Sequence, residues 1–315
     1  YALYLNQNGN HKIFINQLET VPEDLGVEKV RFTDSDSYMD LVIKTTDHTE
    51  PLGIDKNMPA RFLLPLIDQK AASGFVNASL ALDQARAVKD IQEQELMRKA
   101  SHLNDMAMAE ITHFFKEGVT ETDLAEQLKK IYRDLGADGL SFEPLFAFGS
   151  NAASGHHWPD DTRLKPGDCI LVDIGCTWEG YCSDMTRTFF YKNVTQHQQE
   201  VYHTVLKANE EAEKAVTPGI PLSSLDQIAR GIITDKGYGS AFTHRLGHFI
   251  GLEDHEFGDV SSASADRAVP GNIFSIEPGV YLENDMGVRV EDLVLVTDHG
   301  HEILNHFSKE LTVID

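Results

Sequence analysis

Two segments in the second half of the chain each place two acidic residues inside apolar, strand-like sequence. The first reads CILVDIGCTWEGYCSDMTRTFFY and contains Asp173 and Asp184, and the second reads IFSIEPGVYLENDMGVRVEDLVLV and contains Glu277 and Glu291. In both, an apolar run leads into a turn-forming stretch with glycine and is followed by another apolar run, which is typical of β-hairpins. We therefore expect two hairpins that each carry a pair of carboxylates.

Pairing across each turn predicts where these acidic side chains meet. A hairpin centred between Trp178 and Glu179 sets Asp173 opposite Asp184, and a hairpin centred on Asn284 sets the two glutamates opposite each other. Like charges directly across a ladder destabilise it, so these pairs require positive charge between them. Two carboxylates can instead share a proton, but four together suit hard divalent cations better.

A histidine-containing segment, HRLGHFIGLEDHE, lies between the two hairpins. Its His248 stands beside glycines that allow close approach to an ion, and neutral imidazole is a good ligand for divalent metals. A lone aspartate is usually a turn residue and a lone histidine a core residue, but neither reading accounts for the combination. The sequence predicts a two-metal site with a water or hydroxide between the ions; the expected ligands are Asp173, Asp184, His248, Glu277 and Glu291.

These motifs resemble the pita-bread metallopeptidases, the superfamily of methionine aminopeptidase, Xaa-Pro aminopeptidase and prolidase. The matching stretches are VDIG, SDMTRT, GHFIGLEDHE, IEPG and VRVED, in the ligand order Asp-Asp-His-Glu-Glu. The short step from Glu277 to Glu291, with SIEPGVY and GVRVED around it, resembles the prolidase and Xaa-Pro aminopeptidase branch. The resemblance implies an α+β fold, a homodimer, and a pita-bread catalytic domain over residues 85–315.

Residues 1–84 carry no chemical motif and alternate short apolar strands with helical patches. They resemble the later part of the creatinase-type N-terminal domain that precedes the catalytic domain in prolidases. Because the chain begins at Tyr1 inside a strand-like YALYL, we expect the start of that domain to be absent from this sequence.

Apolar residues at helical spacing predict two helix pairs in the catalytic domain. In the first pair, one helix is expected over residues 88–117 and ends at Gly118. The other begins at Thr120, with Asp123 in the capping-box position. The second covers about 196–214 and 222–236. Two helix pairs, each followed by a carboxylate hairpin, favour an internally duplicated domain.

The resemblance also implies roles for residues outside the ligand set. His255 is expected to contact the substrate or stabilise the developing oxyanion. In HHWPDD, the spacing to proline selects His156, rather than His157, for the scissile amide or the leaving nitrogen. His244 matches a histidine that organises the metal pocket. Arg289 stands two residues before Glu291 on the same strand face, so from its position we expect it to orient that carboxylate, with direct binding of a substrate carboxylate as the alternative.

Two departures from the family pattern fall in the histidine segment. Phe249 replaces the middle glycine of Gly-His-Gly-Ile-Gly, and Asp254 replaces a small apolar residue before His255. The proline and arginine that often follow Glu256 in prolidases are also replaced. We expect metal binding to tolerate these changes. They do not decide whether the substrate is restricted to dipeptides.

The composition of the chain indicates which classes of partner are excluded and in which compartment the protein is expected. The net charge of −23 argues against a nucleic-acid partner, which would need clustered basic residues. No apolar run reaches about 18 residues and no signal-like N-terminus is visible, so a membrane partner is not expected. The three cysteines form no Cys-x-x-Cys pair and are expected to be reduced in a cytoplasmic protein.

Together with the predicted two-metal site, the resemblance implies a cytoplasmic dinuclear peptidase that cleaves the Xaa-Pro bond, with dipeptides as the preferred substrate. A metal-bridging hydroxide is the expected nucleophile, Glu277 accepts its proton, and Mn²⁺ is favoured over Co²⁺, Fe²⁺ or Zn²⁺. The alternatives are an Xaa-Pro aminopeptidase for longer peptides and a non-catalytic binding protein with the same fold.

Overall fold

The computed structural model describes residues 1–315, which divide into two compact units, Tyr1–Leu82 and Asp83–Asp315. The identification of the first unit as a creatinase-type domain stays a prediction.

The first unit contains two small sheets. In one, β1 (Ala2–Tyr4) pairs antiparallel with β2 (Lys12–Asn16), which pairs parallel with β3 (Glu28–Phe32). In the other, β4 (Pro51–Ile54) and β5 (Gly74–Asn77) pair in parallel. The helices α1 (Tyr38–Thr45) and α2 (Ala60–Asp68) supply buried Ile43 and Leu66 to a small core. Helix α3 (Ser79–Ala87) follows β5 and crosses the division between the units.

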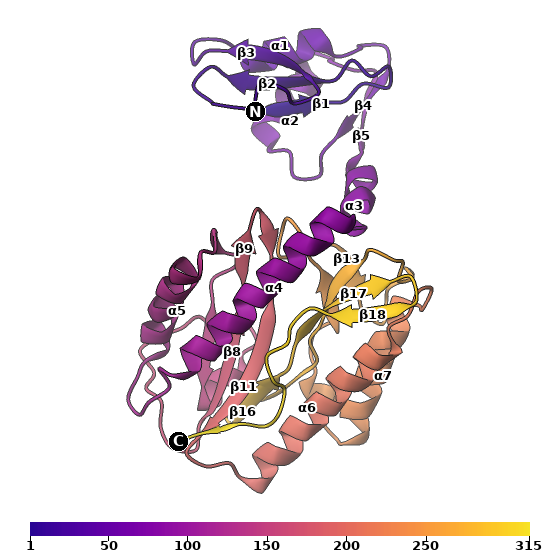
Figure 1. The fold of residues 1–315 in the computed structure, drawn as a ribbon. Helices are drawn as coiled ribbons and strands as arrows, with labels where there is room; N and C mark the ends of the chain where they lie inside the picture. The colour runs from indigo at the N-terminus through magenta and orange to yellow at the C-terminus, as the bar shows by residue number, and fades with distance from the viewer. The chain divides into compact units, whose positions relative to one another are not determined.

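The second unit contains the two expected helix pairs, α4 (Ile91–Thr112) with α5 (Glu121–Leu135) and α6 (Gln196–Ala215) with α7 (Leu222–Asp235). Figure 1 shows one pair in purple and the other in salmon, on different sides of the strands of this unit. The capping box of Thr120 with Asp123 is confirmed. The expected end of the first helix at Gly118 is wrong, because α4 already ends at Thr112 and the Gly118 N–H donates to the Leu164 carbonyl instead.

The strands of the second unit form four sheets. The largest has the order β13 (Glu256–Val260), β12 (Gly247–Phe249), β14 (Ile273–Ile276), β17 (Asp292–Thr297) and β18 (Gly300–Ile303). A four-stranded sheet has the order β19 (Val313–Ile314), β11 (Met185–Tyr191), β8 (Cys169–Ile174) and β7 (Leu145–Phe148). The smaller sheets are β10 (Tyr181–Cys182), β9 (Cys176–Trp178) and β6 (Gly139–Leu140), and the pair β15 (Gly279–Leu282) and β16 (Met286–Arg289). Two 3₁₀ turns, η1 (Gly149–Ala153) and η2 (Gly239–Ala241), complete the unit.

Strand β8 separates two cores, which explains its continuous apolar sequence. Ile170 and Val172 pack in the core that contains α4 and α5, while Cys169 and Leu171 pack in the core that contains α6 and α7. Because successive side chains of a strand point to opposite faces, Asp173 falls on the second of these faces. A strand that is buried on both sides therefore holds its single charge in the interior of the unit.

The first carboxylate hairpin is not centred where the sequence suggested. Its two-residue turn consists of Glu179 and Gly180, with φ of 46° and 84°, a pattern that suits the tight turns of hairpins. The register therefore sets Thr186, rather than Asp184, opposite Asp173. Asp184 lies just before β11, so the expected direct pairing of the two aspartates is wrong.

The second carboxylate hairpin has the expected register. The β14–β17 ladder ends at the pair Ile276 and Asp292, and the β15–β16 ladder continues with the same register. This register sets Glu277 opposite Glu291. Asn284, at the centre of the turn, has a φ of 60°, which confirms the midpoint read from the sequence.

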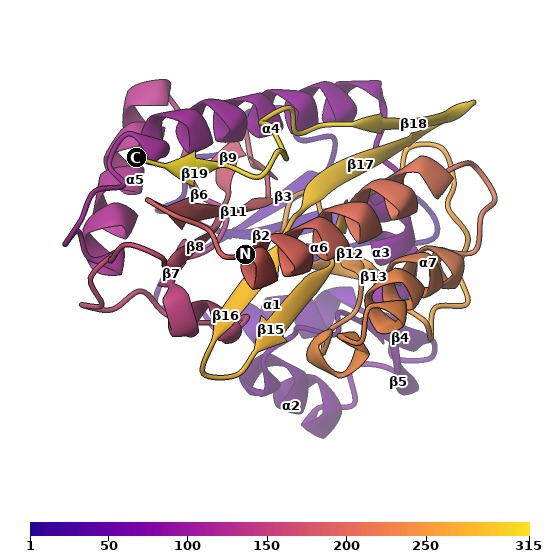
Figure 2. The same cartoon turned by 90° about the horizontal axis from the view of Figure 1, so that it is seen from below.

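The β15–β16 hairpin joins the two halves of the second unit. It contacts β8 and η1 on one side and α6 on the other. Figure 2 shows β8 to the left of the hairpin and α6 to its right. None of the helices combines the length and the apolar character that a membrane crossing requires.

Candidate metal centre

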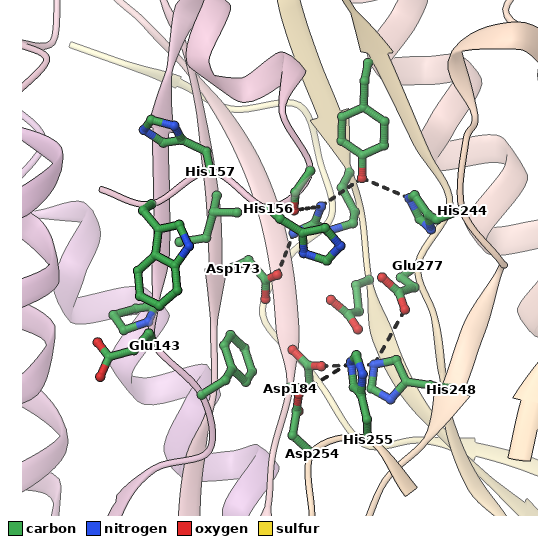
Figure 3. A pocket seen from close by; sticks show the side chains of 18 of the residues that line it. Glu143, His156, His157, Asp173, Asp184, His244, His248, Asp254, His255 and Glu277 are labelled. Atoms are coloured by element: carbon green, nitrogen blue, oxygen red, sulfur yellow. Dashed lines mark hydrogen bonds and ion pairs between the residues drawn. The ribbon is translucent and has the colours of Figure 1, made fainter. Parts of the chain in front are cut away.

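One cavity of about 770 Å³ in the second unit collects every side chain that the sequence selected. Figure 3 shows Asp173, Asp184 and Glu277 directed into the same space, with His248 and His255 beside them. The nine selected residues in its lining are Asp173, Asp184, Glu277, Glu291, His156, His244, His248, His255 and Arg289. Their catalytic and ligand roles stay predictions.

His248 lies at the junction of the two hairpins. Its Nε2 is 3.5 Å from Asp184 Oδ2 and 3.5 Å from Glu277 Oε1. Its Nδ1 lies 3.2 Å from the backbone carbonyl oxygen of the next residue, Phe249. Burial lowers the pKa of His248 to about 3, with His255 as a smaller contribution, so the imidazole is neutral. With a proton on Nδ1, the Nε2 lone pair faces the two carboxylates.

Three of the predicted ligand carboxylates have a buried oxygen without a hydrogen-bond partner: Asp173 Oδ1, Asp184 Oδ1 and Glu291 Oε1. Asp184 and Glu291 are only 4% and 1% exposed. Burying charged oxygens without a donor is costly unless a cation compensates them. The donor set of carboxylate oxygens and one imidazole nitrogen therefore fits divalent cations, as expected from the sequence.

The remaining oxygens of the ligand carboxylates are held by other residues of the chain. Arg289 Nη2 donates to Asp173 Oδ2, and the Thr186 hydroxyl donates to Glu291 Oε2 at 2.6 Å. The Ser275 hydroxyl donates to Glu277 Oε1 at 3.1 Å. These contacts fix the carboxylates in orientation, which is how outer residues tune metal sites in proteins.

Burial and mutual repulsion favour the protonated carboxyl forms in this cavity. The pKa of Asp184 is raised by burial and by Glu291, and that of Glu291 by burial and by Glu277. Burial raises the pKa of Glu277 to about 7, although nearby Arg289 acts in the opposite direction. Bound cations would reverse this preference, because they stabilise the ionised carboxylates.

His244 contacts the ligand set through two other side chains. Its Nε2 is 2.9 Å from the Tyr281 hydroxyl, which accepts a hydrogen bond from Arg289 Nη1 at 2.8 Å. Arg289 in turn pairs with Asp173. Burial and the charge of Arg289 lower the pKa of His244 to about 4, so a neutral ring accepts from the tyrosine. The structure thus places His244 and Arg289 in one chain of contacts that ends on a predicted ligand.

His255 and His156 are the exposed histidines of the cavity. The His255 side chain is 57% exposed, and its ring centroid is 3.9 Å from that of His248. His156 is also exposed and projects into the central space in Figure 3. Both rings are therefore accessible to a molecule that enters the cavity.

His157, which the spacing to proline did not select, turns away from the metal ligands and is anchored by a buried carboxylate. Its Nε2 is 2.6 Å from Oε2 of Glu121, a fully buried side chain. Glu121 also accepts hydrogen bonds from Phe148 N, Asn151 Nδ2 and Asp160 N. Although Glu121, His157 and Asp160 are close enough to hold an ion, these donors already satisfy the Glu121 carboxylate. The cluster orders the loop that carries His156.

Sequence reasoning missed Thr186, Ser275 and Tyr281. Ser275 precedes Glu277 by two residues on the same strand face, so strand periodicity could have found it. Thr186 becomes visible only with the true register of the first hairpin. Nothing local in the sequence distinguishes Tyr281, because its partners come from β16 and from the segment before β12.

The chain is similar to known proteins over nearly its whole length. The model of metallopeptidase family M24 matches residues 95–298. An uncharacterized peptidase of Staphylococcus aureus (strain bovine RF122 / ET3-1) is 35% identical over 320 residues, which cover 98% of this chain and 88% of that protein.

Solved structures give the same result. A prolidase from Thermococcus sibiricus matches with a TM-score of 0.94 and 33% identity, covering 99% of this chain and 86% of that one. The dipeptidase PepE from Mycobacterium ulcerans matches with a TM-score of 0.91, 33% identity and the same coverages. An X-Pro aminopeptidase from Thermotoga maritima has a TM-score of 0.87 and 29% identity, covering 97% and 88%.

These similarities confirm the expected α+β pita-bread fold and the resemblance to the prolidase branch. They also agree with the cavity, whose residues fit divalent cations. The chain belongs to metallopeptidase family M24, a family of metal-dependent peptidases.

Proposed function

We propose that this protein is a dinuclear metal-dependent peptidase that hydrolyses the Xaa-Pro bond, preferentially in dipeptides. The observation that carries the proposal is the buried group of Asp184, His248 and Glu291. Their possible ligand atoms lie within 4.8 Å of one another, and each of the two carboxylates has a buried oxygen without a hydrogen-bond partner. The similarity to prolidases and dipeptidases supports the substrate class.

The metal-holding residues divide between two ions. Asp173 and Asp184 would hold one, and Asp184, His248 and Glu277 the other, with Glu291 shared between them. Two divalent cations at these residues would supply an acidified water as nucleophile and would polarise the scissile carbonyl. We propose Mn²⁺ as the preferred ion, since four of the five donors are carboxylates.

Glu277 is the proposed general base. As a carboxylate among the proposed metal ligands, it would lie beside the attacking water and could accept its proton. The Ser275 hydroxyl holds Oε1 and so limits the rotation of the carboxylate. Glu277 thus accepts the proton of the attacking water while its own position stays fixed.

His255 and His156 are proposed to contact the substrate. Because both are accessible from the cavity, they can donate to the carbonyl oxygen and stabilise the tetrahedral intermediate. A prolyl nitrogen carries no N–H, so the site needs room for a ring rather than an acceptor for an amide hydrogen. His244 acts at a distance, through Tyr281 and Arg289, on the position of Asp173.

The preference for dipeptides rests on a cation at the cavity wall. Arg289 is occupied by Asp173, Tyr281 and Thr186, whereas Arg245 lines the cavity with a side chain that is 35% exposed. The partner of Arg245 is Asp259, itself half exposed. A substrate carboxylate can compete for this guanidinium, and only a dipeptide brings its C-terminal carboxylate so close to the scissile bond.

Xaa-Pro aminopeptidase activity on longer peptides is the second candidate. It is favoured by the similarity to the Thermotoga maritima enzyme and by the altered sequence after Glu256. Comparing Ala-Pro and Leu-Pro with an Xaa-Pro tripeptide, each with Mn²⁺, separates the two. Faster turnover of the dipeptides supports the main proposal. Turnover of the tripeptide alone would transfer the function to the aminopeptidase class, and turnover of neither would contradict both.

Two further properties are proposed on narrower grounds. A cytoplasmic location is supported by the three cysteines, which are all unpaired and buried. A homodimer is proposed from the resemblance alone, and sedimentation at micromolar concentration tests it.

A further inference from the structure

A fifth carboxylate, that of Asp254, lies in the cavity beside the four that were predicted as ligands. It follows β12 on the bend that leads to His255. We propose that Asp254 is an additional metal ligand, which donates an oxygen to one of the two divalent cations. This inference rests on the proposed metal centre and adds a residue to it.

The position of Asp254 brings it to the ligands rather than to the cavity mouth. Its side chain lies next to that of Asp184, and Figure 3 shows it directly below Asp184 and directed toward it. Its Oδ2 is 3.5 Å from His255 Nε2, and the His255 ring lies tilted against that of His248, with 3.9 Å between the ring centroids. Asp254 therefore lies beside Asp184, which is a proposed ligand of both ions.

The strongest support is an unsatisfied oxygen. Oδ1 of Asp254 is buried and has no hydrogen-bond partner, like one oxygen each of Asp173, Asp184 and Glu291. The same argument therefore applies to all four: a buried anionic oxygen without a donor requires a cation. Elsewhere in the unit a buried acid has such a cation, since Asp292 Oδ2 pairs with Lys309 at 2.7 Å. Asp254 has no comparable lysine or arginine among its contacts.

The charges in the cavity lead to the same conclusion. The four predicted ligand carboxylates are offset in part by Arg289, which pairs with Asp173. The four carboxylates and Arg289 together carry a net charge of −3. Asp254 brings this charge to −4, which balances the charge of two divalent cations. Two other roles remain as rivals: Asp254 shares a proton with Asp184, or it binds the ammonium group of the substrate.

The test is a Mn²⁺ titration of chelator-treated protein, with free Mn²⁺ followed by its electron paramagnetic resonance. Asp254→Val removes the oxygen, and Asp254→Asn keeps a neutral oxygen in a side chain of the same shape, which also protects the test against misfolding. Glu143→Gln is the matched control, because Glu143 lines the same cavity but is 57% exposed and pairs with Lys129. We expect two ions in the wild type. In Asp254→Val the dissociation constant of one ion should rise at least tenfold, in Asp254→Asn by less, and in Glu143→Gln it should not change.

Each rival gives a different result. Equal losses in the valine and asparagine variants would mean that Asp254 acts by charge alone, which overturns ligation. Unchanged Mn²⁺ affinity in both would also overturn it, in favour of proton sharing, or of ammonium binding if KM for Ala-Pro rises. A wild type that binds two ions but leaves Xaa-Pro peptides intact refutes the proposed function and not this inference. A wild type that binds no Mn²⁺ refutes the metal centre, and the inference with it.

Discussion

The two carboxylate hairpins hold their acidic residues by different means. In the glutamate hairpin, the same register on both sides sets Glu277 opposite Glu291, in the gap between the two ladders. In the aspartate hairpin, Asp173 lies within β8 while Asp184 lies before β11, so no ladder pairs them. The register of the glutamate hairpin thus sets its two acidic residues opposite each other, whereas the register of the aspartate hairpin does not.

Each hairpin also holds an acidic residue of the other hairpin. Arg289 of the glutamate hairpin pairs with Asp173, and Thr186 of the aspartate hairpin donates to Glu291. Arg289 Nε also donates to Thr186 Oγ1 at 2.9 Å, which joins both contacts. The comparison teaches that the site is one network across two hairpins, so damage to either half should disturb the ligands of the other.

The largest effect is expected from removal of a ligand at the junction. His248→Ala and Asp184→Asn should each lower bound metal below two ions per chain and abolish detectable hydrolysis of Ala-Pro, because both residues lie where the hairpins meet. Elemental analysis and a dipeptide assay measure the two effects. A variant with both ions and full activity would show that the junction is not the metal centre.

Glu277→Gln should be nearly as severe for the reaction. The substitution removes a charged ligand and the proposed base, so we expect kcat to fall by about 10²–10⁴-fold. Steady-state kinetics at saturating Mn²⁺ measure the loss. If only KM rises while kcat is unchanged, Glu277 binds substrate and another group is the base.

The exposed histidines should affect the reaction without affecting the metal. His255→Ala and His156→Ala should each lower kcat/KM by about 10²–10³-fold, since each removes a donor to the reacting amide. Metal content should stay at the wild-type value. Metal loss in the His255 variant would place that residue among the ligands. A defect in His157→Ala, with none in His156→Ala, would show that the wrong histidine of the pair was selected.

Thr186 tests the coupling between the hairpins. Thr186→Val has the same shape but removes the donor to Glu291 and the acceptor for Arg289, so metal affinity should fall by about 10–100-fold. Thr186→Ser, which keeps the hydroxyl, should retain most of the affinity. Equal affinities in all three proteins would mean that the contact across the hairpins does not support the site.

The smallest effect concerns the stability of metal-free protein as a function of pH. A carboxyl whose folded-state pKa is raised contributes stability that is lost as pH rises through that pKa, about 7 for Glu277 and about 8 for Asp254. The buried histidines have lowered pKa values, so their contribution to the stability of the folded state increases with pH. This increase levels off above about pH 6.5, the pKa of histidine in the unfolded chain. Between pH 6.5 and 8 the melting temperature should therefore fall, by about 3–6 °C.

Two controls isolate this effect by calorimetry. Asp254→Asn should flatten the dependence, because the amide does not titrate, and Mn²⁺ should remove it, because the ion stabilises the ionised carboxylates. A metal-free protein whose melting temperature rises over this pH range would contradict the proposed crowding of carboxylates.

The sequence predicted the residues that meet in the cavity better than it predicted how they meet. Glu277 and Glu291 follow from the symmetry of their hairpin about Asn284, which the register confirms. The aspartate register was placed incorrectly, because apolar patterning alone does not distinguish a turn at 178–179 from one at 179–180. In the structure the turn has a positive φ at Glu179, and the apolar residues on either side do not predict this turn type.

The support around the ligands was harder to predict because it depends on contacts between distant segments. Arg289 could be assigned to a neighbouring carboxylate, but its partner, Asp173, comes from the other hairpin. Asp254 was visible only as a departure from the family pattern, and its unpartnered oxygen required the fold. Patterns within a strand reveal candidate ligands, whereas the residues that orient them emerge from tertiary packing.

The most direct test of the account is the rate of Ala-Pro hydrolysis measured against the number of Mn²⁺ ions bound per chain. Starting from chelator-treated protein, the account predicts no hydrolysis without metal, and binding that saturates at two ions as the rate reaches its plateau. Full activity in metal-free protein, or binding that saturates at one ion or none, would contradict the two-metal site on which the proposed function depends.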